Sequence, residues 1–517
     1  MKLSEKTISY AVIFLGVVLR LRQYLSGRSL WADEAMLALN IVNRNFAQLF
    51  QPLDYDQGAP LGFLLVEKLI NSILGRTELA LRLFPFLAGV ASLWLFYLLL
   101  LSLRASSEAS GLDTPFATNA QGYSTTVPRN DGIGFLLALT LFTFNPQLID
   151  YSSEAKQYIV DVAAALGLLL LVIPIFQNQI NRKNFILLGL AGIFALWFSH
   201  PALFILAGIG VALVIHFLRT RDYRNLRTTF AVGLLWLANL AALYFVNLRD
   251  LSRNNYLTKY WADGFLPLPP WSDLNWLNEL IVYQFGVQFL PWLVLILILA
   301  GWFVLFREQK SLAVAFAFTA LFAFTASALR LYPVSGRLSL FLIPLGIILL
   351  GKAVELAQSI FASNKLAATV STILLGGYLL ISPLVESTQN FISPKYYEHI
   401  RPTMQVLADS WKDGDALFVT AWAEPAFRYY APFYGLENVE YVSSRIEDYP
   451  DGEALKRRIS PLVGKKRVWV LFSHVYEQGG FNERDYLVAY LDSIGEKRRE
   501  ILKSGTSVYL FFYDLSP

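Results

Sequence analysis

The stretch Arg28-Ser29-Leu30-Trp31-Ala32-Asp33-Glu34-Ala35-Met36 decides how the chain is arranged at its first membrane boundary. It follows the first apolar segment, Ile8 to Leu19, and contains two adjacent carboxylates, Asp33 and Glu34. A charged pair is costly inside a bilayer and tolerated in the water beside it, so we expect this pair just beyond the end of a membrane helix. A purely structural role is the alternative, because acids at a helix N-terminus interact favourably with the helix dipole.

The composition is that of a polytopic membrane protein. The 517 residues are 55% hydrophobic and only 16% charged, whereas soluble domains carry roughly 25% charged residues. Aromatic residues reach 15%, which suits interfacial belts and a cavity that holds a sugar or a lipid. The net charge of +4 is too small to indicate nucleic-acid binding, and the absence of Cys excludes disulfides, Cys-ligated metals and thiol chemistry.

Apolar segments long enough to cross a bilayer recur along most of the chain. On the criterion of roughly 20 apolar residues per span, the sequence predicts about eleven membrane helices. They lie at about residues 8–25, 83–103, 133–149, 158–176, 185–200, 201–218, 229–248, 287–306, 311–329, 338–356 and 366–385.

Lys and Arg in the connecting loops predict the orientation. If the N-terminus is cytoplasmic, every cytoplasmic connection is basic, and an odd number of spans places the loop of Asp33 and the C-terminal region outside the cytoplasm. We therefore predict a multi-pass protein of the plasma (inner) membrane. Several cations fall in external segments against this rule, which suggests an anionic ligand there: Arg249, Arg253, Lys259, Arg330 and Arg337.

Two domains are predicted, a transmembrane domain over 1–385 and an extracytoplasmic α/β domain over 386–517. The first external loop, 26–82, contains two amphipathic stretches, Glu34 to Phe50 and Leu61 to Leu74, that we expect to lie in the interface. The cytoplasmic loop 104–132 is rich in small polar residues and is expected to be mobile. The aromatic loop 249–286 is either a lid or an interfacial belt.

The C-terminal region alternates strand-like and helical patterns, which is typical of a small α/β domain. Strands are predicted at Ala416 to Thr420, Val439 to Val442, Val468 to Phe472 and Ser507 to Tyr513, and helices at Tyr396 to Ser410, Glu424 to Phe433, Glu453 to Ile459 and Glu483 to Ile494.

Three motifs in order carry a resemblance to a known superfamily. Trp31-Ala32-Asp33-Glu34-Ala35 in a long first external loop is followed by Gly58-Ala59-Pro60-Leu61 and then by Glu78-Leu79-Ala80-Leu81-Arg82-Leu83-Phe84-Pro85. This resembles the GT-C glycosyltransferases, in the branch of protein O-mannosyltransferases, lipid A aminoarabinose transferases and bacterial dolichyl-phosphate-mannose-transferase-like proteins. Tyr151-Ser152-Ser153-Glu154-Ala155-Lys156-Gln157-Tyr158 is similar to a further family segment, with Lys156 where many members have Arg. Ala59 departs from the second Pro of many members, and the resemblance is good over roughly residues 1–200.

The resemblance implies an α-helical polytopic fold of GT-C type and a hexosyl- or pentosyltransferase that uses a polyprenyl-phosphate-linked sugar on the outer face of the membrane. The family's first-loop acid, taken as the catalytic base, corresponds to Asp33. The chemistry supports this role, because a carboxylate within hydrogen-bond reach can take the proton of an attacking acceptor hydroxyl. A single displacement with a phosphate leaving group requires no cofactor and inverts the anomeric centre. Glu34 is a second catalytic candidate that positions the acceptor or Asp33.

A leaving polyprenyl phosphate needs cations, and Arg suits this task because its planar fork pairs with phosphate oxygens. Arg337 is the first candidate, since it is predicted at an external helix end near Tyr332; Lys156 and Arg82 follow. The alternative for all three is that they extend toward the membrane interface without binding a ligand.

Four more residues are candidates for a pocket that holds the donor sugar or the acceptor: Glu154, Tyr158, Tyr332 and His200. Glu154 and Tyr158 are one helical turn apart and would face the same side. A structural ion pair for Glu154 and a helix cap for His200 are the alternatives. The spacing of His and acidic residues supports no metal site, although a divalent metal stays open.

A polytopic transporter or a flippase for lipid-linked sugars is the alternative function. It predicts ionisable residues in the middle of the spans, whereas Asp33 and Glu154 fall at their external ends. A non-catalytic scaffold is a third reading. The sugar and the acceptor (protein, lipid or glycan) are not determined by the sequence.

Overall fold

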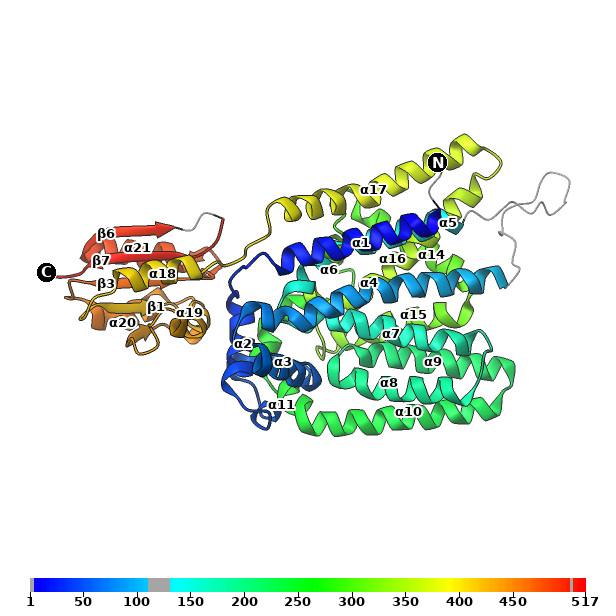
Figure 1. The fold of residues 1–517 in the computed structure, drawn as a ribbon, viewed down its shortest axis with the longest axis horizontal. Helices are drawn as coiled ribbons and strands as arrows, with labels where there is room; N and C mark the ends of the chain where they lie inside the picture. The colour runs from blue at the N-terminus through cyan, green and yellow to red at the C-terminus, as the bar shows by residue number, and fades with distance from the viewer. Residues whose placement is uncertain (1–3, 110–130, 503–504) are drawn as a thin grey trace.

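A helical bundle with an α/β domain at one of its ends makes up the protein (Figure 1). The computed structural model describes residues 4–109, 131–502 and 505–517. The first helix, α1 (Glu5–Tyr24), begins at the end of the bundle away from the α/β domain. Most of the loop expected to be mobile, 104–132, lies outside the described residues.

Every predicted apolar segment coincides with helical structure. The helices are α1, α4 (Glu78–Ala109), α5 (Asp131–Phe144) followed by α6 (Pro146–Asp150), α7 (Tyr158–Phe176), α8 (Arg182–Phe198), α9 (Ala202–Thr220), α10 (Tyr223–Leu243), α14 (Pro291–Glu308), α15 (Lys310–Ala328), α16 (Ile343–Ile360) and α17 (Lys365–Ile392). Within the described ranges, 8 helices are long and apolar enough to cross a membrane, or up to 9 if the bent pair formed by α5 and α6 counts as one span. The number eleven therefore stays a prediction, because α1 and α8 are not among these helices.

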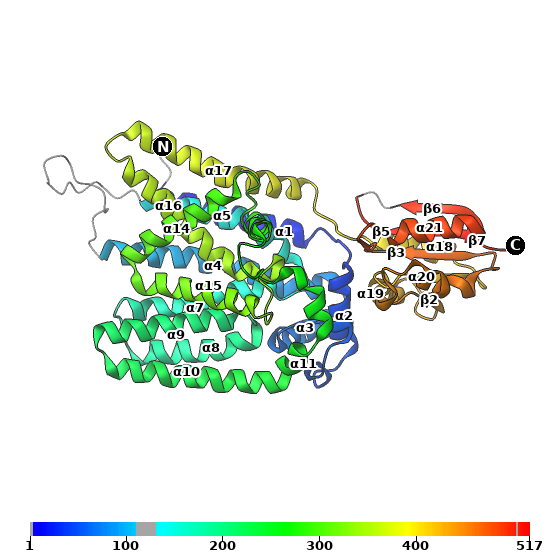
Figure 2. The same ribbon diagram turned by 180° about the vertical axis from the view of Figure 1, so that it is seen from behind.

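Short helices close the end of the bundle that faces the α/β domain. Figure 2 shows α2 (Ala32–Asn43), α3 (Leu61–Leu74) and α11 (Arg249–Ser252) there. The predicted stretch 61–74 is one helix, while the stretch from Glu34 is interrupted after Asn43 and resumes only as the turn Gln48–Phe50. The aromatic loop 249–286 is partly helical, with α12 (Asn255–Tyr260) and α13 (Leu274–Phe285).

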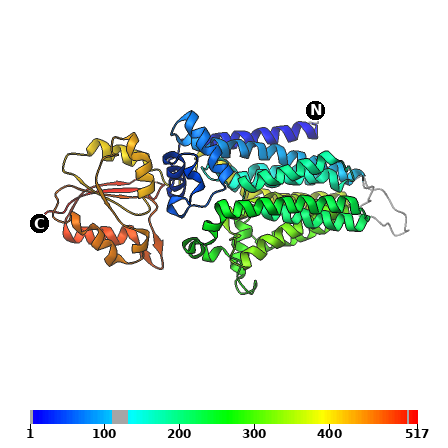
Figure 3. The same cartoon turned by 90° about the horizontal axis from the view of Figure 1, so that it is seen from below.

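The α/β domain is a five-stranded sheet with helices on both faces (Figure 3). Its strand order is β2 (Tyr441–Ser443), β1 (Ala416–Val419), β3 (Val468–Phe472), β7 (Tyr509–Asp514) and β6 (Glu496–Leu502). The first three strands are parallel, and β7 and β6 are antiparallel to their neighbours. Successive side chains of a strand point to opposite faces, so Leu417 packs with α18 (Arg401–Ser410) and α19 (Glu424–Tyr430), and Phe418 with α20 (Gly452–Ile459) and α21 (Glu483–Ile494).

The edge strand β6 is absent from the sequence-based prediction. Its sequence, Glu496-Lys497-Arg498-Arg499-Glu500-Ile501-Leu502, is mostly charged and lacks the apolar alternation by which strands are recognised. Charged residues are common on edge strands, because they discourage pairing with another chain. The pairing of β6 with β7 therefore depends on the tertiary structure more than on the local sequence.

Candidate functional site

A large cavity opens where the end of the bundle meets the α/β domain. Its empty volume is about 1470 Å³, including the space open to solvent. Its lining comes from α2, from the starts of α7 and α9, from the segment 251–265 and from the α/β domain. The polar and aromatic side chains in this lining include Trp31, Asp33, Tyr55, Gln57, Lys156, Tyr158, Asp161, His200, Tyr256, Tyr260, Trp261, Arg330, Tyr332, Arg337, Trp422 and His474.

Four side chains from distant parts of the chain form a charged centre in this cavity: Asp33, Gln57, Lys156 and Arg337. Lys156 Nζ lies 2.9 Å from Asp33 Oδ1, and Arg337 Nη2 lies 2.8 Å from Asp33 Oδ2. Gln57 donates a hydrogen bond to Asp33 Oδ1 (3.1 Å) and accepts one from Lys156 (2.6 Å). Each oxygen of the carboxylate therefore faces a different cation.

The charged centre sets the protonation of Asp33. Burial alone would raise the pKa of this carboxyl, but the nearby charges of Arg337 and Lys156 outweigh burial and hold the pKa well below its usual range. For Lys156 the balance goes the other way, because burial lowers its pKa more than Asp33 restores it. At neutral pH, Asp33 is thus an ionised carboxylate held by cations.

Arg337 is surrounded by aromatic rings. Its guanidinium carbon lies 5.3 Å from the ring centre of Trp31 and 5.4 Å from those of Tyr158 and Trp261. Such contacts stabilise a cation that has lost part of its hydration. The cage orients a guanidinium whose fork is suited to a planar or tetrahedral anion.

Glu34 and Arg82 form a buried pair behind the cavity and do not line it. The Nε and Nη2 atoms of Arg82 lie 2.9 and 2.6 Å from the two oxygens of Glu34, which also accepts a hydrogen bond from the Ala155 amide (2.8 Å). This pair connects the start of α2 to α4 and to the segment before α7. The sequence-based hypothesis has Arg82 bind the donor phosphate and Glu34 position the acceptor or Asp33, whereas the structure places both residues behind the charged centre, which they support.

Glu154 is also buried behind the cavity wall, 3.9 Å from Arg28. Burial, only partly offset by Arg28, raises its pKa to about 7. Tyr158, Tyr332 and His200, in contrast, all line the cavity as the sequence-based hypothesis requires. The structure therefore brings six of the nine predicted site residues to one cavity: Asp33, Lys156, Arg337, Tyr158, Tyr332 and His200.

The α/β domain contributes side chains that sequence reasoning did not assign to the site. Trp422 and His474 line the cavity, and His474 Nδ1 lies 2.7 Å from Glu398 Oε1. The other oxygen of Glu398 accepts a hydrogen bond from the Ala32 amide (2.8 Å), directly before Asp33. Asp161 was missed as well, although it follows Tyr158 by one helical turn and this spacing would have indicated the same face.

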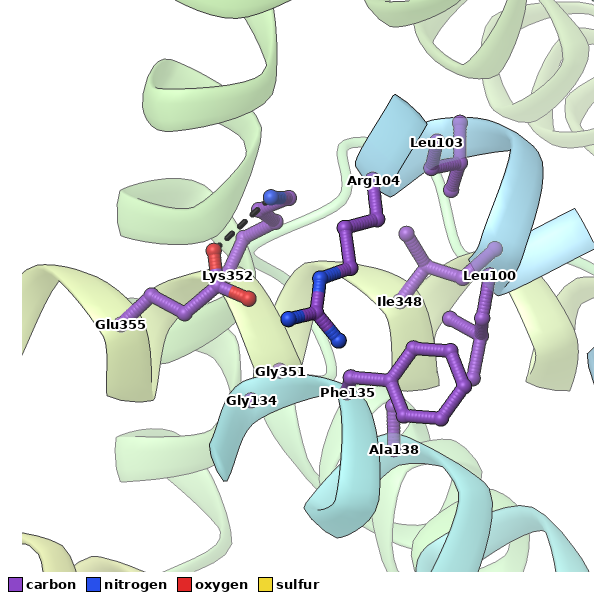
Figure 4. Close-up of a pocket in the computed structure, with 10 residues that line it drawn as sticks. All are labelled: Leu100, Leu103, Arg104, Gly134, Phe135, Ala138, Ile348, Gly351, Lys352 and Glu355. Atoms are coloured by element: carbon purple, nitrogen blue, oxygen red, sulfur yellow. Dashed lines mark hydrogen bonds and ion pairs between the residues drawn. The ribbon is translucent and has the colours of Figure 1, made fainter. Parts of the chain in front are cut away.

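Metal ligands are not grouped in the described part of the chain: no set of three or more His, Cys, Asp or Glu side chains there is placed to hold a metal ion. A second, smaller hollow lies between α4, α5 and α16 (Figure 4). Lys352 there is paired with Glu355 (2.8 Å) and Glu308 (3.0 Å), and Arg104 is paired with Glu5. This hollow holds ion pairs between helices, so the large cavity is the candidate functional site.

Comparison with known proteins identifies the fold. No protein-family model and no curated protein sequence matches the chain. Among solved structures, ArnT from Cupriavidus metallidurans bound to undecaprenyl phosphate superposes with a TM-score of 0.53 and 13% identity over 98% of each chain. The chain has a GT-C fold. The GT-C oligosaccharyltransferase of Archaeoglobus fulgidus, solved in complex with Zn and sulfate, also superposes, with a TM-score of 0.50 and 12% identity over 89% of this chain and 67% of that one. The GT-C fold expected from the sequence is thereby confirmed.

Proposed function

We propose that this protein is a membrane glycosyltransferase that moves a sugar from a polyprenyl-phosphate-linked donor to an acceptor on the outer face of the plasma membrane. The observation that carries the proposal is one ionised carboxylate, Asp33, held between Lys156 and Arg337 in a large aromatic cavity. The GT-C fold supports it, as does the undecaprenyl phosphate bound by ArnT.

In this proposal the donor phosphate replaces Asp33 as the partner of both cations. Arg337 offers two parallel donors to phosphate oxygens, and Lys156 adds a point charge. While both cations hold Asp33, its low pKa makes it a weak base, because proton-transfer efficiency rises as the pKa of the base approaches the working pH. Donor binding draws the cations toward the phosphate and raises the pKa of Asp33. Base activation is thus coupled to the presence of the donor.

The transfer itself is one displacement at the anomeric carbon. The acceptor hydroxyl oxygen forms a bond to this carbon while Asp33 takes the hydroxyl proton. The bond between the anomeric carbon and the phosphate oxygen breaks, and polyprenyl phosphate leaves with the electron pair on its oxygen beside Arg337 and Lys156. The configuration inverts, and the step needs no cofactor. Glu34, Arg82 and Glu154 act in this scheme as positioning residues behind the charged centre.

The test uses the purified protein in lipid nanodiscs, supplied with a polyprenyl-phosphate-linked sugar and in turn with protein, lipid and glycan acceptors. We expect release of polyprenyl phosphate together with a glycosylated acceptor of inverted configuration. Asp33→Asn keeps the shape of the side chain and removes the base, so the rate is expected to fall by about 10²–10⁴-fold. Asp273→Asn, at an exposed helix cap that Asn also satisfies, is the matched control.

Two results would contradict the proposal. Unchanged release by a folded Asp33→Asn protein would remove Asp33 as the base. Movement of the intact lipid-linked sugar across sealed vesicles, without release of polyprenyl phosphate, would favour the flippase alternative.

A further inference from the structure

An acidic side chain on the cavity wall, Asp161, has no assigned role. It lies in the first turn of α7, one helical turn after Tyr158, and only 5% of the residue is exposed. The residue lines the cavity, and its Oδ1 atom is buried without a hydrogen-bond partner among the described residues. Ser199 is the hydroxyl that interacts with this carboxyl. One acceptor atom at the cavity wall is therefore left open.

A buried acceptor without a hydrogen bond is informative because it destabilises the folded protein. A buried polar atom without a hydrogen bond costs about 1–3 kcal/mol, and nearly all buried polar atoms in folded proteins are satisfied. An exception on the wall of a cavity is explained if the missing donor belongs to the ligand. The donor must be polar, since an apolar polyprenyl chain against Asp161 would leave the carboxyl unsatisfied.

The position of Asp161 relative to the charged centre indicates which part of the ligand it meets. Tyr158, one turn away on α7, contacts the guanidinium of Arg337 through its ring. His200 and Tyr332 also line the cavity, and the Nε2 atom of His200 is another of the buried polar atoms that lack a hydrogen-bond partner among the described residues. A molecule whose phosphate is bound at Arg337 and Lys156 can thus reach Asp161 with the polar group attached to that phosphate.

We propose that Asp161 is a specificity-determining residue that accepts a hydrogen bond from a hydroxyl group of the donor sugar, in a cavity that His200 also lines. The inference rests on the proposed function, because it takes the sugar of a polyprenyl-phosphate donor as the ligand. The selected class is a neutral sugar with a free hydroxyl at the position that faces Asp161.

The experiment compares donors that lack one hydroxyl at a time. In the wild-type protein, loss of the hydroxyl that faces Asp161 lowers kcat/KM about 10–100-fold, the size expected when a buried polar group is left without its hydrogen-bond partner. Asp161→Ala lowers kcat/KM for the complete donor by a similar factor. With the deoxy donor that lacks the facing hydroxyl, Asp161→Ala and the wild type are expected to have the same kcat/KM. Asp161→Asn keeps a carbonyl acceptor in a side chain of the same shape, so its kcat/KM for the complete donor is expected to lie between those of the wild type and Asp161→Ala. Asp273→Asn is again the matched control.

Binding of sugar-free polyprenyl phosphate separates this inference from the proposed function. This binding requires Arg337 and Lys156, which hold the phosphate, and no contact with a sugar. Asp161→Ala and Asp161→Asn are therefore expected to bind the sugar-free lipid with the affinity of the wild type. If Asp161→Ala does not fold, Asp161→Asn decides. If no donor is turned over, the proposed function fails, and the ratio of affinities for sugar-linked and sugar-free lipid in wild type and Asp161→Asn still tests Asp161.

The inference is overturned if both Asp161 variants lose the same factor on every deoxy donor, because Asp161 would then be structural. It is equally overturned if they match the wild type on the complete donor, or if the ratio of affinities for sugar-linked and sugar-free lipid does not change.

Discussion

Arg337 shows why the type of cation matters at a single position. Its guanidinium contacts Asp33 and three aromatic rings at once. An ammonium group is a compact, strongly hydrated point charge and does not reproduce the fork or the stacking. The identity of this residue, and not only its charge, is therefore expected to determine how well a phosphate binds.

Arg337→Lys is expected to weaken the binding of sugar-free polyprenyl phosphate by about tenfold, because the bidentate contact and part of the cation–π stabilisation are lost. Binding isotherms in detergent or nanodiscs measure the change. Arg330→Lys makes the same exchange at an exposed position of the cavity lining and should have a smaller effect. Equal affinities for wild type and a folded Arg337→Lys would contradict a phosphate-binding role.

At the scale of elements, the start of α2 depends on α4. Arg82 donates to both oxygens of Glu34 and also to the carbonyls of Arg28 and Ser29 (2.8 and 3.2 Å), so one side chain holds the whole turn that leads to Asp33. Removing one partner of a buried ion pair leaves the other charge uncompensated.

Glu34→Gln is expected to destabilise the protein by roughly 3–5 kcal/mol, measured as the loss of unfolding free energy in a denaturant titration. The double variant Glu34→Leu, Arg82→Met leaves no uncompensated charge and should therefore recover part of the lost stability. The recovery is incomplete because the carbonyls of Arg28 and Ser29 still lack the donor that Arg82 provided. A single variant as stable as the wild type would show that the pair does not support α2.

Elements with strong local patterns could be predicted from the sequence, and contacts between distant elements could not. Helix α3 is predicted with its observed bounds because its apolar face and turn residues are contiguous, whereas the charged strand β6 has no such signal. Asp33 could be proposed through the family resemblance, and Arg337 from its predicted place at an external helix end. Gln57 and Glu398 could not, because their roles come from partners far away in the chain.

At the scale of the whole molecule, the α/β domain is part of the site and not an appendage. Tyr430 accepts a hydrogen bond from the Leu30 amide (2.8 Å) and donates one to Glu78 (2.9 Å). Arg401 lies 3.3 Å from the same Glu78 carboxylate. The domain therefore holds the segment before Asp33 from one side while Arg82 holds it from the other.

The His474–Glu398 contact should make this docking depend on pH. Burial lowers the pKa of His474, but the hydrogen bond and the charge of Glu398 outweigh burial, so the net pKa is raised from its usual 6.5. Stability from the charged contact is fully present below pH 6.5 and is lost as the pH rises through the folded-state pKa. Hydrogen exchange at the start of α2 is expected to accelerate between pH 6 and pH 9, after correction for the intrinsic rate.

His474→Gln is the control for this prediction, because Gln donates to Glu398 without titrating. The variant should show a smaller change in corrected exchange between the two pH values, with the remainder due to Glu154, whose pKa of about 7 lies in the same range. If it keeps the pH dependence of the wild type, another group controls the docking.

Glu398 has a consequence for anyone who recombines these proteins. Its carboxylate accepts a hydrogen bond from the amide of Ala32, so the first turn of α2 is completed by a residue encoded more than three hundred codons later. A chimera that grafts a foreign C-terminal module onto this bundle must bring an equivalent carboxylate to that amide. Without it, the helix that carries Asp33 begins with an N–H group that has no hydrogen-bond partner. A defect in such a hybrid would then report a poorly formed domain junction, and it would say nothing about the acceptor.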